Sequence, residues 1–445
     1  MKKLKTDPAL RQQIAAVLKL SLPAILTQIT TIAMQYIDSA MVGALGAKAS
    51  AAIGLVATCT WLFNGVTYAV SAGFSVQVAH CIGAQRDDSA RAVVKHGLIS
   101  ALLVSVLLCI LGALISRPLP AWLGGEADIR ADATAYFLVF ALYLPFSQIN
   151  SLTSSFLQCC GDMVTPSILN AAMCLLDVLF NALFIPHYGV LGAGIGTALA
   201  CVTVSLAMLW CCCVRNKHLR LHRSEKCRFD GQILKKAFKI GAPVAVQEIA
   251  MRKYELLGAA AIAANSFAVT AESLCYMPGY GIGSAATTLV GRRIGANQPK
   301  EAKRYGNICI ALGAAFMGGT GLVMMLLCPY VFMLLTPDAA VRELAVQGLR
   351  SGLIAEPLFG VSITAAGALR GTGDTFVPGI LNLISIWGVR IGLALLLVGP
   401  LGLHGMWIAM ACELCVRGLL MLYRQHATKY YRSRNSVQPR DAQQS

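Results

Sequence analysis

The sequence predicts an all-α membrane protein with about twelve transmembrane helices in two lobes, and three observations support this fold class. The chain has 445 residues, of which 56% are hydrophobic and only 13% are charged, whereas a soluble protein has about 25% charged residues. Apolar stretches of about 18 residues or more, long enough to cross a bilayer, recur along the chain. Several polar breaks occur twice, which indicates an internal repeat.

The apolar stretches between polar breaks define the expected spans. They lie near residues 16–43, 50–80, 92–116, 130–157, 166–186, 190–213, 239–258, 259–289, 306–328, 340–369, 378–399 and 402–424. The first stretch is too long for the apolar region of a signal peptide and has no small-x-small cleavage site. We therefore expect it to remain as a span.

The repeat indicates two six-helix halves with the same orientation. Three pairs share one separation along the chain: GDMVTPSILN (161–170) with GDTFVPGILN (373–382), HCIGAQ (80–85) with RRIGAN (292–297), and Pro145 with Pro357. Parallel repeats of this kind are a transporter architecture, in which the binding site lies between or within the lobes.

The net charge of +16 comes from basic residues that lie in the polar breaks between spans, so it does not indicate nucleic-acid binding. Basic residues concentrate in residues 81–95, 215–232 and 292–304 and in both terminal segments. An even number of spans puts all of these on one side, which the positive-inside rule makes cytoplasmic. The expected segments are a cytoplasmic N-terminus (1–15), a first lobe (16–213), a basic cytoplasmic linker (214–238), a second lobe (239–424) and a cytoplasmic tail (425–445).

Cysteine usage argues against a metal site and against a disulfide framework. The 16 cysteines occur singly or in apolar runs such as residues 211–213, without the paired spacing of zinc ligands. GALGAKAS (43–50) lacks the spacing of a phosphate-binding loop, which argues against an ATP-driven pump. We expect neither an enzyme nor a bound cofactor or metal.

The seventh span is short and charged. It begins like the first, since GAPVAVQEI (241–249) resembles SLPAILTQI (21–29), but it falls out of register with the rest of the repeat. Its charged residues are Arg252, Lys253 and Glu255. The stretch after Pro243 covers about 22 Å as a helix, less than the roughly 30 Å of the apolar bilayer core. Either the helix starts well before Pro243, or part of the span has been lost.

Several motifs together resemble one family of membrane proteins. The residues that carry this resemblance are Pro23, Gln28, Asp38, Val42, Gly43, Leu45 and Gly46 in and after the first span, the two Ile-Gly-Ala turns, LVGRRIGA (289–296), ALRGTGDT (368–375) and the run 263–291. Over about residues 15–425 the chain is similar to bacterial multidrug and toxic compound extrusion (MATE) transporters.

This resemblance implies a secondary active antiporter in the bacterial inner membrane, acting as a monomer. Members of the family export organic cations and other amphipathic drugs in exchange for protons or sodium ions. The implied partners are small cationic or amphipathic molecules and the lipid bilayer, with no nucleic acid.

Asp38 is the first candidate site residue, because it follows a long apolar stretch without charge. An ionised carboxylate inside a bilayer costs about 3 kcal/mol on insertion scales, so it persists where it faces a wet cavity or a partner. The resemblance implies a proton-coupling role for Asp38. The alternative is a partnered polar residue that closes the end of a helix.

Asp177 and Asn181 lie one turn apart and share a helix face. The family often has Asn-x-x-x-Asp here, and this chain has the two residue types exchanged, so an acid and an amide remain for a cation site. Thr197, in GAGIGT (192–197), matches a family threonine that lines the same cavity. Its alternative is a hydroxyl bonded to its own helix.

Counted along the spans, Asp38 falls in the outer half of the membrane and Asp177 near its midplane.

The resemblance also implies candidate acids in the second lobe, namely Glu248, Glu272 and Glu356. Basic residues fall in nearby spans, and Glu413 lies one turn before Arg417. Structural ion pairs are therefore the alternative for acids in this lobe.

Pro23 is a candidate hinge, because proline removes a backbone donor and can bend the first span. The alternative is a proline that the membrane helix simply tolerates.

Two further functions are less favoured. A flippase for lipid-linked or polysaccharide precursors, from the same wider group, tends to need a cationic cavity, whereas the first-half spans hold acids. An intramembrane aspartyl protease would use YID (36–38) and GTGD (371–374), but Gly-Asp also recurs at 161–162, where a repeated turn explains it better.

Overall fold

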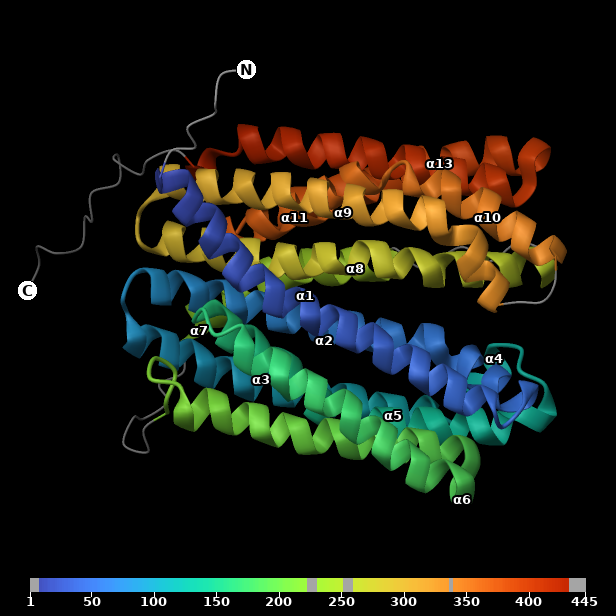
Figure 1. Cartoon of the computed structure of the whole chain (residues 1–445). Coiled ribbons are helices and arrows are strands. Elements are labelled where there is room, and N and C mark those ends of the chain that lie inside the picture. The colour runs from blue at the N-terminus through green and yellow to red at the C-terminus, as the bar shows by residue number, and fades with distance from the viewer. Residues whose placement is uncertain (1–7, 222–229, 251–258, 336–338, 432–445) are drawn as a thin grey trace, which may run out of the picture.

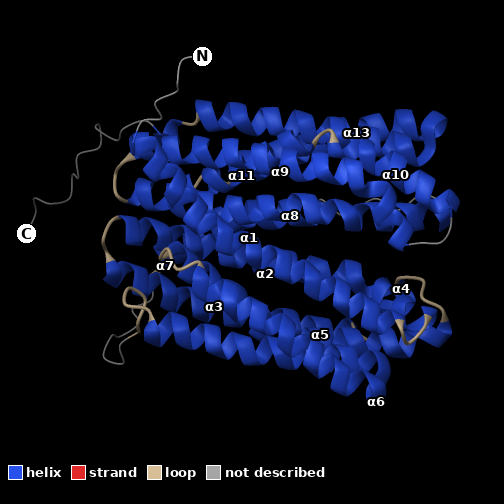
Figure 2. Cartoon of the chain, viewed as in Figure 1, coloured by secondary structure: helices blue, strands red, loops and turns tan. Residues whose placement is uncertain are grey.

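The computed structural model describes residues 8–221, 230–250, 259–335 and 339–431. All regular elements in these ranges are helices (Figure 2). They form two lobes side by side, the blue-to-green first half and the yellow-to-red second half in Figure 1. Apolar side chains pack around Phe74, Phe156 and Met208 in the first lobe and around Phe332 and Trp407 in the second, and further apolar clusters join helices of both halves.

The first lobe consists of long helices that end at the polar breaks. They are α1 (Pro8–Gly43), α2 (Ala47–Gly83), α3 (Asp87–Ile115), the short α4 (Leu119–Trp122), α5 (Ala127–Cys159) and α6 (Val164–Trp210), which continues as a π-helical turn (Cys211–Arg215). Gly189 interrupts α6 with a positive φ of 56°, a backbone conformation that favours glycine. The chain reverses there, so α6 contains two spans (Figure 1).

The second lobe repeats this plan. Its helices are α7 (Gly231–Ala250), α8 (Ala259–Gly295), α9 (Pro299–Leu335), α10 (Ala339–Leu353), α11 (Glu356–Thr372), α12 (Phe376–Ile384), a π-helical turn (Ser385–Ile391), α13 (Gly392–Ala427) and a final 3₁₀ turn (Lys429–Tyr431). Gly402 interrupts α13 with a φ of 54°, as Gly189 interrupts α6. α10 and the following α11 form a pair bent by 56°.

Length and composition identify most of these helices as spans. Among the described residues, seven helices are long and apolar enough to cross a membrane, or eight if the bent α10–α11 pair is one span. Two of the seven, Val164–Arg215 and Phe376–Ala427, are 52 residues long, and each crosses twice because of its glycine break. With α7 and α8, the described chain forms the twelve-helix, two-lobe arrangement that the sequence predicts.

The repeated turns have matching backbones. Gln85 and Asn297, at equivalent places in the two Ile-Gly-Ala turns, have positive φ values of 57° and 58°. Gly161 and Gly373, in the two Gly-Asp turns, have φ values of 84° and 87°. The Gly-Asp pattern is therefore a helix-ending turn in both lobes, as the sequence comparison suggests.

The basic breaks lie at one end of the bundle. α1 begins there, α13 ends there, and the α2–α3 and α8–α9 turns lie at the same end (Figure 1). α7 begins at Gly231, well before Pro243, and extends to Ala250. The sequence predicts this span only from residue 239. The start at Gly231 agrees with the explanation that the helix begins well before Pro243. Arg252, Lys253 and Glu255 lie outside the described residues.

The two lobes meet where backbones approach through glycine. A Cβ on Gly281 of α8 would lie 2.6 Å from the backbone nitrogen of Ile25 in α1. A Cβ on Gly73 of α2 would lie 2.5 Å from the carbonyl oxygen of Ala237 in α7. Small residues permit such close contact between membrane helices. The first helix of each half thus packs against a helix of the other half.

Candidate functional site

Asp38, Asp177 and Asn181 meet within the first lobe, near the end where α1 finishes. The amide Nδ2 of Asn181 donates hydrogen bonds to Oδ1 of Asp38 at 2.8 Å and to Oδ2 of Asp177 at 3.2 Å. Asp38 belongs to α1, whereas the other two residues lie on the first part of α6. One side-chain amide therefore connects carboxyl groups from two helices.

The two carboxyl groups lie close together because both accept from the same nitrogen of Asn181. A proton on one of them would allow that group to donate a hydrogen bond to the other. Asp177 and Asn181 have no exposed surface, while Asp38 is half-buried. The pair can therefore hold a proton, or a small cation in its place, at a position that remains partly accessible.

These contacts correct our expectation of depth. Residue counts put Asp177 near the midplane and Asp38 in the outer half, yet the donor that they share in Asn181 places both side chains at one level. The reason is that α1 crosses the lobe obliquely (Figure 1). Distances counted along α1 and along α6 therefore run in different directions, and they cannot be compared as depths in the membrane.

Two residues that sequence reasoning missed lie beside this cluster. A Cβ on Gly196 would fall 2.1 Å from Oδ1 of Asn181, so only glycine fits there. Tyr136 on α5 interacts electrostatically with both aspartates. The small-residue pattern of GAGIGT was a signal for Gly196, whereas nothing in the local sequence distinguishes Tyr136.

Thr197 uses its hydroxyl within its own helix. Its Oγ1 donates to the carbonyl oxygen of Ala193 at 3.1 Å. This is the alternative that we gave for Thr197. Its neighbour Gly196, rather than Thr197, is the residue whose contact with Asn181 is observed.

Pro23 lies in α1 at a contact with α6. Ser167 donates a hydrogen bond of 2.5 Å to the Pro23 carbonyl oxygen, and Thr27 donates to the same oxygen at 3.1 Å. The two hydroxyl groups are also 2.9 Å apart. Hydroxyl groups of this kind help to satisfy backbone groups that a proline disturbs in a membrane helix.

Glu272 and Glu356 form a second buried acidic cluster. They are 5% and 1% exposed, lie on α8 and at the first turn of α11, and interact electrostatically with each other. A Cβ on Gly352 would lie 2.8 Å from Trp407 and 3.6 Å from Oε1 of Glu272, so the cluster lies beside the bend between α10 and α11. Both oxygens of Glu356 lack a hydrogen-bond partner among the described residues.

The remaining second-lobe candidate is Glu248. It lies on α7, but its side chain is outside the described residues. Among the residues that are described, no group of three or more His, Cys, Asp or Glu side chains is placed to hold a metal ion.

Glu413 and Arg417 form a buried ion pair in the second lobe. Nε of Arg417 lies 3.1 Å from Oε1 of Glu413, and the two side chains are 6% and 0% exposed. Ser385 donates to the same carboxylate oxygen at 2.8 Å. The ion-pair alternative that we considered for this lobe is thus observed at Glu413.

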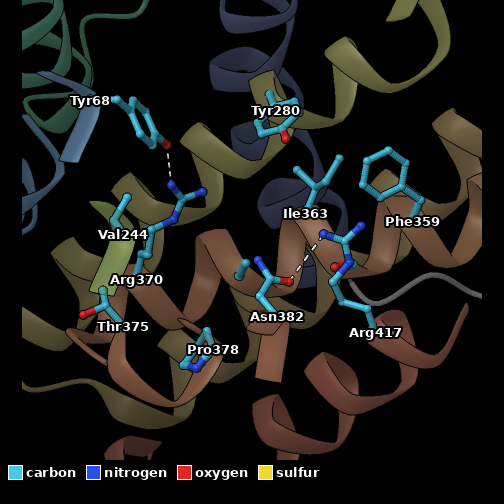
Figure 3. Close-up of a pocket in the computed structure, with 12 residues that line it drawn as sticks. Tyr68, Val244, Tyr280, Phe359, Ile363, Arg370, Thr375, Pro378, Asn382 and Arg417 are labelled. Carbon is cyan, nitrogen blue, oxygen red and sulfur yellow. Dashed lines mark hydrogen bonds between the residues drawn. The ribbon is translucent and has the colours of Figure 1, made fainter. Parts of the chain in front are cut away.

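A cavity lies on the second-lobe side of the interface between the lobes (Figure 3). Tyr68 of α2 contributes from the first lobe, and Arg370, Asn382 and Arg417 contribute from α11, α12 and α13. Arg370 donates a hydrogen bond to the hydroxyl of Tyr68, and its guanidinium lies 5.8 Å from the centre of that ring. Sequence reasoning did not assign a ligand role to any of these residues.

Two lobes of membrane helices, each with buried carboxyl groups, fit a class of protein: the polytopic membrane transporters. Within that class, the family model MatE matches residues 23–183 and 245–396 of this chain. The chain belongs to the MatE family, and it is a multi-pass membrane transporter.

Relatives with multidrug-resistance names match nearly the whole chain. The chain is 27% identical over 432 residues to a probable multidrug resistance protein NorM of Thermotoga maritima. This alignment covers 93% of this chain and 92% of the relative. It is 29% identical over 450 residues to a protein of the same description from Mesorhizobium japonicum, covering 93% and 94%.

Solved structures of transporters share the fold. A mutant of the Vibrio cholerae MATE transporter VcmN matches with a TM-score of 0.88 at 17% identity, covering 95% of this chain and 99% of that one. A MOP superfamily transporter from Pyrococcus furiosus matches with a TM-score of 0.84 at 20% identity, covering 93% and 95%. At these identities the likeness establishes the architecture.

Proposed function

We propose that the protein is a secondary active antiporter that exports organic cations and amphipathic drugs from bacteria in exchange for protons or sodium ions. The observation that carries this proposal is the hydrogen-bonded cluster of Asp38, Asp177 and Asn181. The multidrug-resistance names of the relatives support the same substrate class.

The cluster supports exchange because a proton and a cationic drug compete for the same carboxyl groups. When Asp38 and Asp177 are both ionised, their charges attract a cation strongly in a buried, low-dielectric site. A proton on either group removes part of that attraction and favours the hydrogen bond between them. Proton uptake from outside therefore releases the drug, and proton loss to the inside prepares the site for another drug molecule.

Asn181 has a positioning role in this scheme. Its amide donates to both carboxyl groups, so it keeps them together whichever one carries the proton. Pro23 is proposed as the hinge, because Ser167 and Thr27 bond its carbonyl oxygen where α1 meets α6. Ion and drug change the balance of the two transporter states only through their different affinities for those states.

The proposed location is the bacterial inner membrane, with both chain ends and the basic breaks on the cytoplasmic side. This orientation is supported by the gathering of the basic breaks at one end of the bundle (Figure 1). In that orientation the membrane potential contributes about 2.3 kcal/mol per charge for each 100 mV crossed. The second-lobe acids Glu248, Glu272 and Glu356 are proposed as a further cation-binding group.

Efflux in everted membrane vesicles tests the proposal. A fluorescent cation such as ethidium is followed while a proton or a sodium gradient is imposed, which also identifies the coupling ion. We expect Asp38→Asn to reduce gradient-driven transport by about tenfold or more, the size of a typical coupling between two sites. Asp128→Asn is the matched control, because Asp128 is an exposed acid paired with Lys48. Full transport by Asp38→Asn would refute the role of Asp38.

A further inference from the structure

A groove lies on the outer face of α9, at the basic end of the bundle. It has a volume of about 470 Å³, within the range of about 300–1,000 Å³ that is usual for small-molecule sites. The opposite face of this part of the helix, with Ala302, Tyr305 and Cys309, is buried. The described lining comes from one exposed or half-buried stripe of α9: Lys300, Lys303, Arg304, Asn307, Ile308 and Ala311.

The stripe changes from charged to apolar along the helix axis. Its three basic residues lie in the first two turns of α9, the amide of Asn307 follows, and the apolar Ile308 and Ala311 come last. Residues 308–335 contain no charged residue, so the helix enters the hydrocarbon region in this part. The stripe is about 16 Å long at 1.5 Å per residue. It can therefore extend through a headgroup layer of roughly 5–7 Å into the hydrocarbon core.

The acid in the first turn of α9 does not neutralise the groove. The carboxylate of Glu301 lies 3.1 Å from the guanidinium of Arg293. Lys303 donates a hydrogen bond of 3.5 Å to the carbonyl oxygen of His426, at the end of α13, and an ammonium group has three donors. Arg304 adds positive charge, whatever else its guanidinium contacts, and is not required as a donor. Because the described lining contains no acid, the groove is positively charged.

The equivalent stripe of the first lobe has a different charge pattern. Asp88 and Arg91 on α3 occupy the repeat positions of Lys300 and Lys303. They form an ion pair with each other, so the first lobe has a neutralised pair where the second lobe has two lysines. The two lysines are therefore a feature of the second lobe and not a consequence of the repeated turn.

We propose that this groove binds the headgroup of an anionic phospholipid, with Lys300 and Lys303 as donors to its phosphate. Basic pockets at the surface of membrane helices bind such headgroups, and lysine binds phosphate as a point charge. Asn307 offers an amide at the level of the glycerol oxygens. Ile308 and Ala311 lie where the first part of an acyl chain would pack.

The charge and the position of the groove favour a lipid over other occupants. Residues 1–7 contain three lysines and one aspartate, and residues 432–445 contain three arginines and one aspartate. Neither end of the chain therefore complements a basic groove. A soluble phosphate would leave the apolar part of the stripe without a partner, whereas a phospholipid uses both parts. This site is independent of the proposed exchange at the aspartates.

Native mass spectrometry tests the site on the purified full-length protein. The protein is released from micelles that contain dioleoyl-phosphatidylglycerol or dioleoyl-phosphatidylcholine, and the affinity of each bound lipid is obtained by titration. We expect the parent protein to bind phosphatidylglycerol more tightly. Lys300→Gln/Lys303→Gln should weaken that binding by about tenfold or more, because each lysine near an anionic lipid contributes about fivefold. Lys300→Arg/Lys303→Arg keeps both charges and should retain the binding.

The matched control is Lys235→Gln/Lys239→Gln. These two lysines are exposed on α7 at the same end of the bundle and do not line the groove. The control removes the same charge, so it measures the general attraction of a basic protein for anionic lipid. We expect it to change the affinity by less than about twofold. Monodisperse elution on size exclusion verifies that each variant is folded.

Acetylation of lysines locates the lipid on the parent protein. In nanodiscs of either lipid, a water-soluble succinimidyl ester modifies accessible lysines, and peptide mass spectrometry gives the rate at each one. We expect Lys300 and Lys303 to react several-fold more slowly in phosphatidylglycerol than in phosphatidylcholine. The rates at Lys235 and Lys239 should differ by less than about twofold.

Four results would overturn the site. Equal affinity of the parent protein for the two lipids would remove its basis, and equal weakening by the two glutamine pairs would leave only general surface charge. Displacement of phosphatidylglycerol by inorganic phosphate would assign the groove to a soluble anion. Equal protection of Lys300 and Lys303 in both lipids would assign it to a segment of this chain or to another protein. None of these measurements uses a drug or an ion gradient, so they do not depend on the role of Asp38.

Discussion

Asn181 on α6 donates a hydrogen bond of 2.8 Å to Asp38 on α1, and the same nitrogen also donates to Asp177. A side-chain amide that serves two carboxyl groups makes their behaviour interdependent, because loss of the amide leaves both without their common donor. The contact also holds the C-terminal part of α1, beyond Pro23, against α6. Because Asp38 and Pro23 lie on the same helix, protonation of the carboxyl groups can affect the proposed hinge directly.

The first prediction concerns this shared donor. Asn181→Ala removes both hydrogen bonds, and we expect gradient-driven efflux to fall nearly as far as in Asp38→Asn. The double variant should transport about as well as either single one, because residues that act as one unit are non-additive, with interaction energies of about 0.5–3 kcal/mol. Efflux in everted vesicles measures all three. Strictly additive losses would show that Asn181 acts apart from Asp38.

The second prediction concerns Gly196. A Cβ at this position would lie 2.1 Å from Oδ1 of Asn181, so Gly196→Ala must displace the amide that connects the aspartates. Overpacking of this kind costs about 1–3 kcal/mol, and we expect lower thermal stability together with weaker efflux. Gly194→Ala is the matched control two residues away, since its added Cβ makes only ordinary contacts, at 3.4 Å and beyond. Equal effects of the two variants would contradict the packing argument.

The third prediction separates the charge of Arg417 from its packing. Arg417→Met leaves the fully buried Glu413 without its cation, and breaking a buried pair in this way costs about 3–5 kcal/mol. Replacing both partners, as Glu413→Leu/Arg417→Met, should recover most of that stability, because no uncompensated charge remains. Thermal unfolding in detergent measures both variants. A double variant less stable than Arg417→Met would show that the pair stabilises the lobe beyond its charge balance.

Most of the fold could be predicted from the sequence, because hydropathy reports directly on membrane spans. The repeat was visible since both lobes use the same turns, and Gln85 and Asn297 indeed have the same left-handed backbone. The start of the seventh span was harder to place. Charged residues between Gly231 and Pro243 resemble a linker, although α7 includes them at the basic end of the bundle.

The candidate site was predictable only in part. Buried charge is rare in a membrane and therefore conspicuous, which is why Asp38 and Asp177 could be selected individually. Their contact through Asn181 depends on how α1 tilts against α6, and residue counting along separate helices cannot supply that angle. Tyr136 and Arg370 contribute through contacts between distant helices, so their local sequence contains no signal for them.

The last prediction concerns the contact between the lobes at the basic end of the bundle. Gly83 of α2 and Gly295 of α8 are equivalent in the repeat, and each lies against the other lobe. An added Cβ would fall 1.9 Å from the carbonyl oxygen of Arg292 or 2.0 Å from that of His80. His80 itself donates a hydrogen bond of 2.7 Å to the carbonyl oxygen of Gly371 across the interface. Gly83→Ala should therefore force the lobes apart at this end.

The half-buried thiol of Cys81, next to His80, is a native probe of that opening. We expect a water-soluble maleimide to label Cys81 several-fold faster in Gly83→Ala than in the parent protein, as quantified by peptide mass spectrometry. Gly54→Ala is the control on the same helix, because an added Cβ there meets nothing within 4 Å. Unchanged labelling in Gly83→Ala would mean that the backbones shift locally and the lobes stay closed, so the glycine contact would not govern access from this side.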